Sequence, residues 1–271
     1  MTRATEQTGM LDRGDGVRLA WRRWPGRSPT PGRSPTVVFL PGFGSDMAGG
    51  KAEALAAWCA ERGQGFLRLD YSGHGASGGA FADGTIGRWR DDALAVIDRE
   101  SAGPLVLVGS SMGGWLALLA ALARADRVAA LVGVAAAPDF TEALMWDAMA
   151  PAERNALMTH GRLEAPSPYG PPQTITRALI EDGRRHLLLG APVALDIPVR
   201  LLHGQRDAEV PWETALRLAG RLTGTDVQVL LVKDGDHRLS RPGDLALLTG
   251  LLAPLLGPAL LIPALLIKNG A

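Results

Sequence analysis

Ser111 lies between glycines at the point where an apolar strand pattern meets an apolar helix pattern. The stretch reads LVLVGSSMGGWLALLAALA, residues 105–123, and its Gly-x-Ser-x-Gly spacing centres on Ser111. Ser110 does not fit this spacing, because Val108 stands two residues before it. A sharp turn from strand to helix crowds the backbone, and glycine on either side of the serine relieves the crowding. The pattern predicts that Ser111 is raised above a sheet as a nucleophile; the alternative is an ordinary glycine-rich turn.

A serine nucleophile requires a base, and His237 has the position of one. It lies in KDGDHRLS, in the expected loop between the last strand and the last helix. An acid must hold the second imidazole nitrogen, and Asp207, in LLHGQRDAEVP, follows the preceding strand pattern. Each of the three residues follows a strand, and their order along the chain is that of α/β-hydrolases. The sequence therefore predicts a Ser-His-Asp triad.

Three other acids compete with Asp207 for the role of the acid. Asp139, in AAAPDF, follows the strand before a long insertion and could also reach the histidine. Asp236 adjoins His237, but neighbouring side chains in a loop usually point apart, so a solvated turn residue is the simpler interpretation. Glu209 is close to Asp207 in sequence and is a weaker substitute.

Two backbone amides are expected to form an oxyanion hole. Met112 supplies one of them, because it follows the nucleophile. The loop PGFGSDMAGG supplies the other, and Phe43 is the best candidate because Pro41 has no N–H to donate. The flanking glycines let the backbone approach a substrate carbonyl, although glycines that merely end a strand remain the alternative.

Short apolar runs alternate with helical patterns, which is typical of a mostly parallel sheet covered by helices on both faces. We expect a single α/β-hydrolase domain over residues 1–271. The stretch 139–196 shows no strand pattern, and we expect it to form a small helical lid over the carboxyl edge of the sheet, where such sheets bind ligands. Strands are expected at 17–24, 36–40, 65–70, 104–108, 128–137, 197–204 and 226–233, and helices at 47–62, 85–100, 113–123, 174–189, 212–222 and 242–252.

Apolar side chains in the expected lid have two interpretations. They could line a pocket for an acyl chain, or they could form the lid's own core. The residues concerned are Leu144, Met145, Trp146 and Met149.

The C-terminal segment 254–271 is apolar. No charge occurs between Leu245 and Ile267, but Pro254, Pro258 and Pro263 would interrupt a spanning helix. We expect an apolar tail packed on the body, with membrane or partner contact as the alternative. The N-terminus has no apolar run of the secretory kind, so we expect a cytoplasmic protein.

Charge and composition restrict the partners. Lys plus Arg equals Asp plus Glu at 28 each, so no general field attracts nucleic acid or an anionic membrane. Cys59 is the only cysteine and lies in an amphipathic helix pattern, which favours a buried small residue. There is no phosphate-binding loop and no metal-ligand spacing, so neither a metal nor another cofactor is expected.

Several blocks of the sequence resemble the abhydrolase domain-containing protein 10 family of α/β-hydrolase serine hydrolases. They are LPGFGSDMAGGKAEAL, LRLDYSGHGASGG, IGRWRDDALAVID, LVGSSMGGWLALLAALAR, RLLHGQRDAEVPW and DGDHRLS, between about Val37 and Leu252. The resemblance implies a palmitoyl-protein thioesterase or acyl-glucuronide esterase, with Ser111, Asp207 and His237 as nucleophile, acid and base. The family is mitochondrial, whereas the Ala-, Arg- and Gly-rich composition suits a bacterial member.

These observations lead to one expected activity and three alternatives. We expect a serine hydrolase that cleaves carboxylic esters or thioesters, on small molecules or acylated proteins, through an acyl-enzyme. A cofactor-free perhydrolase and an aromatic-ester hydrolase would use the same triad. A non-catalytic binding module with this fold is the third alternative.

Overall fold

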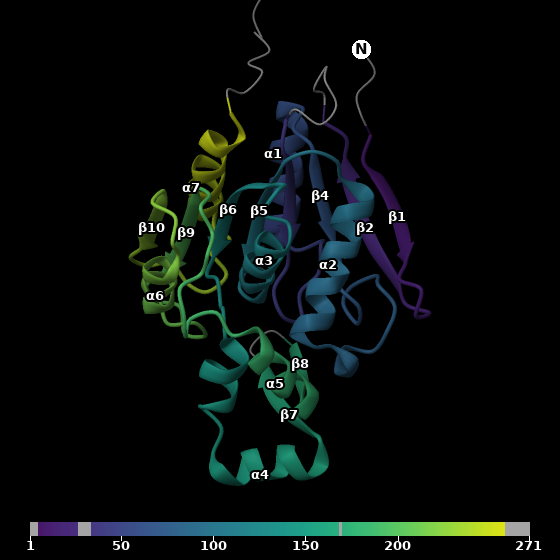
Figure 1. The fold of residues 1–271 in the computed structure, drawn as a ribbon, viewed down its shortest axis with the longest axis vertical. Coiled ribbons are helices and arrows are strands. Elements are labelled where there is room, and N and C mark those ends of the chain that lie inside the picture. The colour runs from purple at the N-terminus through teal and green to yellow at the C-terminus, as the bar shows by residue number, and fades with distance from the viewer. Residues whose placement is uncertain (1–4, 27–33, 168–169, 258–271) are drawn as a thin grey trace, which may run out of the picture.

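The computed structural model describes residues 5–26, 34–167 and 170–257. Eight strands form one twisted sheet in the order β1-β2-β4-β3-β5-β6-β9-β10 (Figure 1). β1 and β2 pair antiparallel, as do β2 and β4, and every other pair in this sheet is parallel. The strands are Gln7–Asp12 (β1), Arg18–Trp24 (β2), Thr36–Leu40 (β3), Phe66–Leu69 (β4), Leu105–Ser110 (β5), Val128–Val134 (β6), Val199–Gly204 (β9) and Val227–Val232 (β10).

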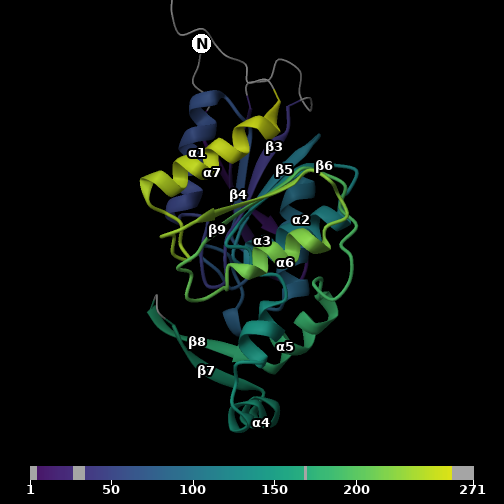
Figure 2. The same ribbon diagram turned by 90° about the vertical axis from the view of Figure 1, so that its left-hand side faces the viewer.

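Helices cover both faces of the sheet, as Figures 1 and 2 show. One face carries α1 (Gly50–Arg62) and α7 (Pro242–Leu252), and the other carries α2 (Ile86–Glu100), α3 (Met112–Ala123) and α6 (Glu213–Arg221). Two apolar clusters fill the spaces between helices and sheet. Because the central strands are covered on both sides, every residue of β5 is buried. The predicted architecture, a mostly parallel sheet with helices on both faces, is confirmed.

The sheet has one strand that the sequence did not predict. β1 forms a hairpin with β2 and occupies the edge of the sheet, so β2 has partners on both sides. None of the residues of β1 is buried. An exposed edge strand needs few apolar side chains, and this is why the segment carries no strand pattern.

The insertion between β6 and β9 is not purely helical, which corrects the expected lid. It contains an antiparallel hairpin of β7 (Arg162–Ser167) and β8 (Gly170–Thr176), together with α4 (Pro151–His160), α5 (Arg177–Gly183) and a π-helical turn at Thr141–Trp146. The expected helix at 174–189 is reduced to α5 and a short 3-10 turn. Proline and glycine in the hairpin hide the alternation that marks a strand.

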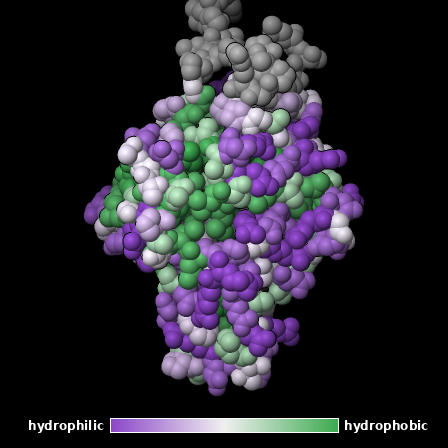
Figure 3. Space-filling view, viewed as in Figure 1, coloured by the Kyte–Doolittle hydropathy of each residue, from purple (hydrophilic) through white to green (hydrophobic). Residues whose placement is uncertain are grey.

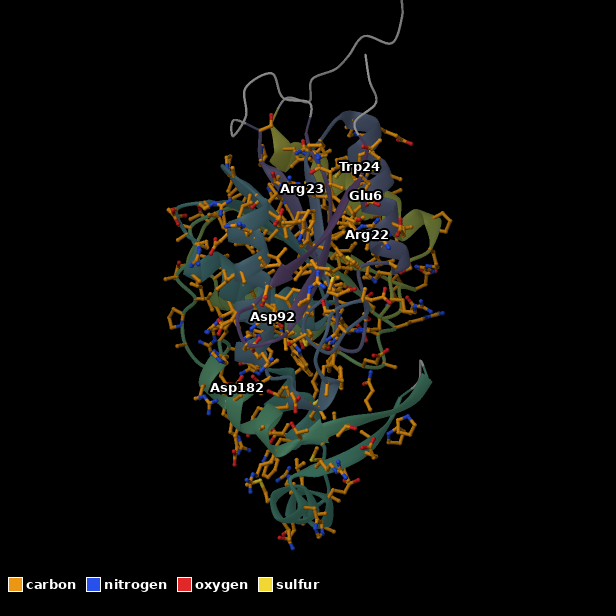
Figure 4. The ribbon with its side chains drawn as sticks, turned by 90° about the vertical axis from the view of Figure 1, so that its right-hand side faces the viewer. Glu6, Arg22, Arg23, Trp24, Asp92 and Asp182 are labelled. Carbon is orange, nitrogen blue, oxygen red and sulfur yellow. The ribbon has the colours of Figure 1, made fainter. Side chains whose placement is uncertain are left out.

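The insertion projects from one end of the sheet and is attached to the body through α5 (Figure 1). Asp182 of α5 accepts a hydrogen bond from the Gly87 amide, in the first turn of α2, at 2.6 Å. A carboxylate at a helix N-terminus meets unpaired N–H groups and a favourable dipole. Figure 4 shows Asp182 at this junction and Asp92, a buried residue of α2, within the body.

The described part of the C-terminal segment continues from α7. Residues 253–256 form a short turn, and Leu255 and Leu256 pack against the cluster under α1 and α7. The rest of the expected tail, 258–271, lies outside the described residues, as do residues 27–33. Within the described part of the chain, no helix has the length and apolar character needed to cross a membrane.

The surface is mixed in character. Figure 3 shows apolar residues gathered around α3 and α6 on the face seen in Figure 1, whereas the insertion is mostly polar. The exposed leucines there include Leu122 of α3 and Leu216 of α6.

Candidate active site

Ser111 occupies a strained turn between β5 and α3. Its φ and ψ are 54° and −121°, a conformation that a non-glycine residue adopts only when its surroundings enforce it. Here the Ser111 N–H donates to the Val134 carbonyl at 2.9 Å, and the Ser111 carbonyl accepts from Gly114 at 2.8 Å. A Cβ at Gly109 would collide with the Gly113 backbone. The predicted glycines are therefore required by close backbone approach, and the turn lifts the Ser111 side chain off the sheet.

The structure brings Ser111, His237 and Asp207 together from three separate loops. Nε2 of His237 lies 3.1 Å from Oγ of Ser111, and Nδ1 of the same ring lies 2.7 Å from Oδ2 of Asp207. The serine oxygen can thus give its proton to an imidazole whose other nitrogen is held by a carboxylate. This arrangement is suited to activating a hydroxyl as a nucleophile.

The side chain of Asp207 is fully buried and accepts hydrogen bonds on both carboxylate oxygens. Its Oδ1 accepts from the amides of Glu209 at 2.9 Å and Val210 at 2.8 Å. Its Oδ2 faces His237 and also His203 Nε2, at 3.2 Å. Burial alone would raise the pKa of Asp207, but hydrogen bonds from His203, His237 and the Val210 amide outweigh it and hold the pKa well below its usual range. The acid therefore stays ionised.

The β3–α1 loop, residues 41–49, lies directly beside Ser111. A Cβ at Gly42 would lie 3.3 Å from the Ser111 Cβ, so a larger residue there would crowd the serine. Phe43, the predicted oxyanion donor, belongs to this loop and lines the same cavity as Ser111. Met112, the other predicted donor, is the first residue of α3, where amides have no partner within the helix. Both candidates therefore lie next to the serine.

Side chains that follow β4 hold this loop in place. The Gly44 amide donates to Nε2 of His74 at 3.2 Å, and the Tyr71 hydroxyl donates to the Pro41 carbonyl at 3.1 Å. Because Gly44 is a donor, Nε2 of His74 accepts and its Nδ1 carries the hydrogen, which faces the Ser72 carbonyl at 3.2 Å. Burial lowers the pKa of His74, which favours this neutral form.

A buried carboxylate supports the same segment from α2. Asp92, which is labelled in Figure 4, accepts hydrogen bonds from the Ser72 amide at 2.8 Å and from the Ser72 hydroxyl at 2.7 Å. Ser72 in turn positions His74 through its carbonyl. The loop beside Ser111 is therefore fixed by contacts that reach the middle of the body.

A cavity of about 800 Å³ opens over Ser111 and His237. Its apolar wall comes mainly from the insertion, which also contributes the polar Gln173, and its other polar residues come from α1, the β9–α6 loop and the His237 loop. The apolar residues include Phe140, Leu144, Met145 and Pro166, and the polar ones include Lys51, Gln173, Glu209 and Ser240. The site could therefore hold a substrate with one apolar and one polar part.

Two of the four predicted acyl-pocket residues line this cavity, namely Leu144 and Met145. Trp146 and Met149 are not among the described residues that line the cavity. They pack against an apolar cluster in the insertion, formed by Leu157, Ile175 and Ile180, which Met145 also contacts. Two guanidinium groups lie over the Trp146 ring, with Arg154 at 5.2 Å and Arg184 at 4.5 Å from its centroid. The structure therefore assigns these two residues to the lid's own core.

The competing acids have other contacts. Both oxygens of Asp139 accept backbone hydrogen bonds, from Leu188 at 2.7 Å and Leu189 at 2.8 Å. Asp236 accepts from the Leu239 amide at 2.9 Å. Glu209 lies on the other side of the imidazole, with Oε2 3.7 Å from Nε2 of His237 rather than beside Nδ1. Only Asp207 among these acids has a described contact with Nδ1.

Lys51 is a cavity residue that the sequence did not indicate. Its ammonium group donates to the Arg238 carbonyl, next to His237, and burial lowers the pKa of Lys51 to about 8. The contact of His203 with Asp207 was also not predicted, although the place of His203 at the end of β9, four residues before Asp207, was a usable signal. Among the described residues, no group of three or more His, Cys, Asp or Glu side chains is arranged to hold a metal ion.

Comparison with known proteins gives one family model and several relatives. The model for serine aminopeptidase S33 matches residues 33–178. The mitochondrial palmitoyl-protein thioesterase ABHD10 of Mus musculus is 40% identical over 240 residues, which cover 88% of this chain and 78% of that protein. The resemblance seen in the sequence blocks is thereby confirmed.

Two solved structures share both fold and sequence with this chain. A putative hydrolase from Agrobacterium vitis S4 is 40% identical, with a TM-score of 0.87, over 93% of this chain and 99% of that one. The mouse alpha/beta hydrolase domain-containing protein 10 is 38% identical, with a TM-score of 0.82, over 92% of this chain and 98% of that one.

Proposed function

The chain belongs to the α/β-hydrolase family that includes ABHD10, and on that premise we propose that it hydrolyses acyl thioesters with Ser111 as the nucleophile. The observation that carries this proposal is the continuous contact from Ser111 Oγ through His237 to Asp207, with Ser111 and His237 lining the cavity. The name of the mouse relative, a palmitoyl-protein thioesterase, supports the thioester as substrate.

The first half of the proposed reaction forms an acyl-enzyme. Nε2 of His237 takes the proton of Ser111 while Oγ attacks the acyl carbon. The Phe43 and Met112 amides stabilise the resulting oxyanion, and Asp207 stabilises the imidazolium. Collapse of the intermediate breaks the carbon–sulfur bond, and His237 returns the proton to the departing thiolate sulfur.

The second half releases the acid. Water gives a proton to Nε2 of His237 and attacks the same carbonyl carbon, and the bond from carbon to Ser111 Oγ then breaks. The proton on Nε2 passes to Oγ and restores the serine. Free enzyme and a carboxylic acid are the products.

The shape of the cavity supports an acyl donor with an apolar chain and a polar leaving group. Leu144, Met145 and Phe140 form an apolar wall for the chain. Lys51 and Ser240 lie on the polar side, where a leaving group with hydrogen-bonding atoms would be accommodated. A thioester of a long-chain fatty acid combines an apolar chain with a polar leaving group in this way.

Measurement of kcat/KM on matched acyl donors tests the proposal. The series pairs thioesters and oxygen esters of the same acids from acetyl to palmitoyl, and adds acyl-glucuronides and an aromatic ester. We expect kcat/KM to rise with chain length and to favour the thioester at each length. A preference for short or aromatic oxygen esters would keep the mechanism and reject the thioester as substrate.

A further inference from the structure

Glu209 lies on the cavity wall beside the nitrogen that transfers protons in the proposed reaction. Its Oε2 is 3.7 Å from Nε2 of His237, and Oγ of Ser111 is 3.1 Å from the same nitrogen. Both oxygens therefore lie near Nε2. The Glu209 side chain is 36% exposed, and it lines the cavity along with Ser111 and His237.

The backbone anchors Glu209 to the triad. Its amide donates to Oδ1 of Asp207 at 2.9 Å, and Oδ2 of that carboxylate holds His237. The next amide, of Val210, donates to the same oxygen at 2.8 Å. The start of the Glu209 side chain is thus held in a constant relation to the imidazole.

Hydrolysis of the acyl-enzyme places a water molecule near this carboxylate. Once Ser111 Oγ is acylated, the attacking water must donate one hydrogen to Nε2 of His237, so its oxygen lies about 3 Å from that nitrogen. The second hydrogen of the water needs an acceptor. A carboxylate oxygen 3.7 Å from Nε2 is near enough to accept it, and a charged acceptor makes a strong hydrogen bond.

We propose that Glu209 is a positioning residue for the hydrolytic water, an inference that rests on the proposed function. The water gives one proton to Nε2 of His237 as its oxygen bonds to the acyl carbon. The bond from that carbon to Ser111 Oγ then breaks, and Oγ takes the proton from Nε2. Glu209 accepts a hydrogen bond throughout and neither gains nor loses a proton.

Other charged groups also lie along the cavity. Asp46, Lys51 and Arg238 line it, and Lys51 donates to the carbonyl of Arg238. Asp207 faces the opposite nitrogen of the imidazole. Among the described contacts of these acids, it is the Glu209 carboxylate that approaches Nε2, and its position therefore fits an acceptor for this water.

Competition between water and methanol tests the inference, because methanol has a single hydroxyl hydrogen. Methanol that donates to Nε2 of His237 has none left for Glu209, whereas water has one. The experiment incubates enzyme and a short-chain thioester in a fixed methanol concentration and measures the ratio of acid to methyl ester. The variants are Glu209→Ala, which removes the acceptor, and Glu209→Gln, which keeps an uncharged oxygen at similar volume. Glu213→Gln, an exposed acid on α6, is the control.

We expect Glu209→Ala to lower the acid-to-methyl-ester ratio about tenfold and Glu209→Gln about threefold, because an uncharged acceptor binds the hydrogen more weakly. Glu213→Gln should leave the ratio unchanged. A purely structural role would slow hydrolysis and methanolysis together, so unchanged ratios in both Glu209 variants would overturn the inference. If the wild-type enzyme forms no acyl-Ser111 by mass spectrometry, the proposed function fails instead.

Discussion

His203, buried at the end of β9, places its Nε2 3.2 Å from Oδ2 of Asp207. The same nitrogen lies 3.0 Å from the Val210 carbonyl, which can only accept, so Nε2 carries the hydrogen. Nδ1 of His203 has no hydrogen-bond partner among the described residues. The oxygen that holds His237 therefore also faces a second imidazole donor, which stabilises the ionised Asp207.

Replacing His203 tests whether this residue acts as a hydrogen-bond donor or only fills space. We expect His203→Leu to lower kcat/KM about tenfold, because a hydrogen bond to a charged group is lost. His203→Gln can place an amide donor near the position of Nε2 and should restore kcat/KM in part. An equal loss of kcat/KM in both variants, together with a loss of thermal stability, would show that His203 acts only in packing.

The turn at Ser111 depends on Gly109. A Cβ at this position would collide with the Gly113 backbone, which cannot move without displacing α3. We expect Gly109→Ala to lower the free energy of unfolding by at least about 2 kcal/mol, measured by urea denaturation. Gly220→Ala is the control, because its Cβ would meet nothing within 4 Å in α6. There alanine should stabilise by roughly 0.5–1 kcal/mol, and equal effects at the two sites would contradict the account of the turn.

Met145 and Met149 form a matched pair in the insertion. Both pack against the apolar cluster of the insertion, but of the two only Met145 is among the described residues that line the cavity. We expect Met145→Ala to lower kcat/KM for a long-chain thioester about fivefold to tenfold relative to the acetyl thioester, because apolar contact with the chain is lost. Met149→Ala should keep this ratio within about twofold. If kcat/KM depends on acyl-chain length in the same way in both variants, the proposal that the apolar wall contacts the acyl chain is wrong.

Burial of the Cys59 thiol makes the free energy of unfolding depend on pH. Burial raises the pKa of Cys59 from 9.0 to about 12. The folded state therefore holds this proton above the pH at which the unfolded chain loses it, so the stabilisation is complete below pH 9 and declines as the pH rises toward 12. Relative to Cys59→Ala, the wild-type free energy of unfolding should fall by about 1 kcal/mol between pH 9 and pH 10. A constant difference over this range would show that the thiol has its ordinary pKa.

The strand and helix order was predictable because buried parallel strands and amphipathic helices leave strong patterns. β5 and α3 are examples, since nearly all their side chains are apolar and buried. β1 and the β7–β8 hairpin were missed for physical reasons. The first is an exposed edge strand, and the second contains proline and glycine, so neither shows a clean alternation.

The candidate site was likewise predictable in part. The ends of parallel strands meet at one edge of a sheet, so the meeting of Ser111, Asp207 and His237 followed from their places after three strands. The directions of other side chains depend on packing that the sequence does not display. Glu209 had been considered only as a substitute for Asp207, yet its carboxylate lies on the opposite side of the imidazole. Trp146 and Met149 likewise turned out to pack within the insertion.

The most direct measurement is kcat/KM for a long-chain acyl thioester with Ser111→Ala, alongside Ser110→Ala and the wild type, with thermal unfolding to verify that each variant is folded. The account predicts that Ser111→Ala loses activity by about a thousandfold or more, because the nucleophile is gone, while Ser110→Ala keeps at least about a tenth. Activity of folded Ser111→Ala within twofold of the wild type would contradict the central claim that this serine carries the acyl group.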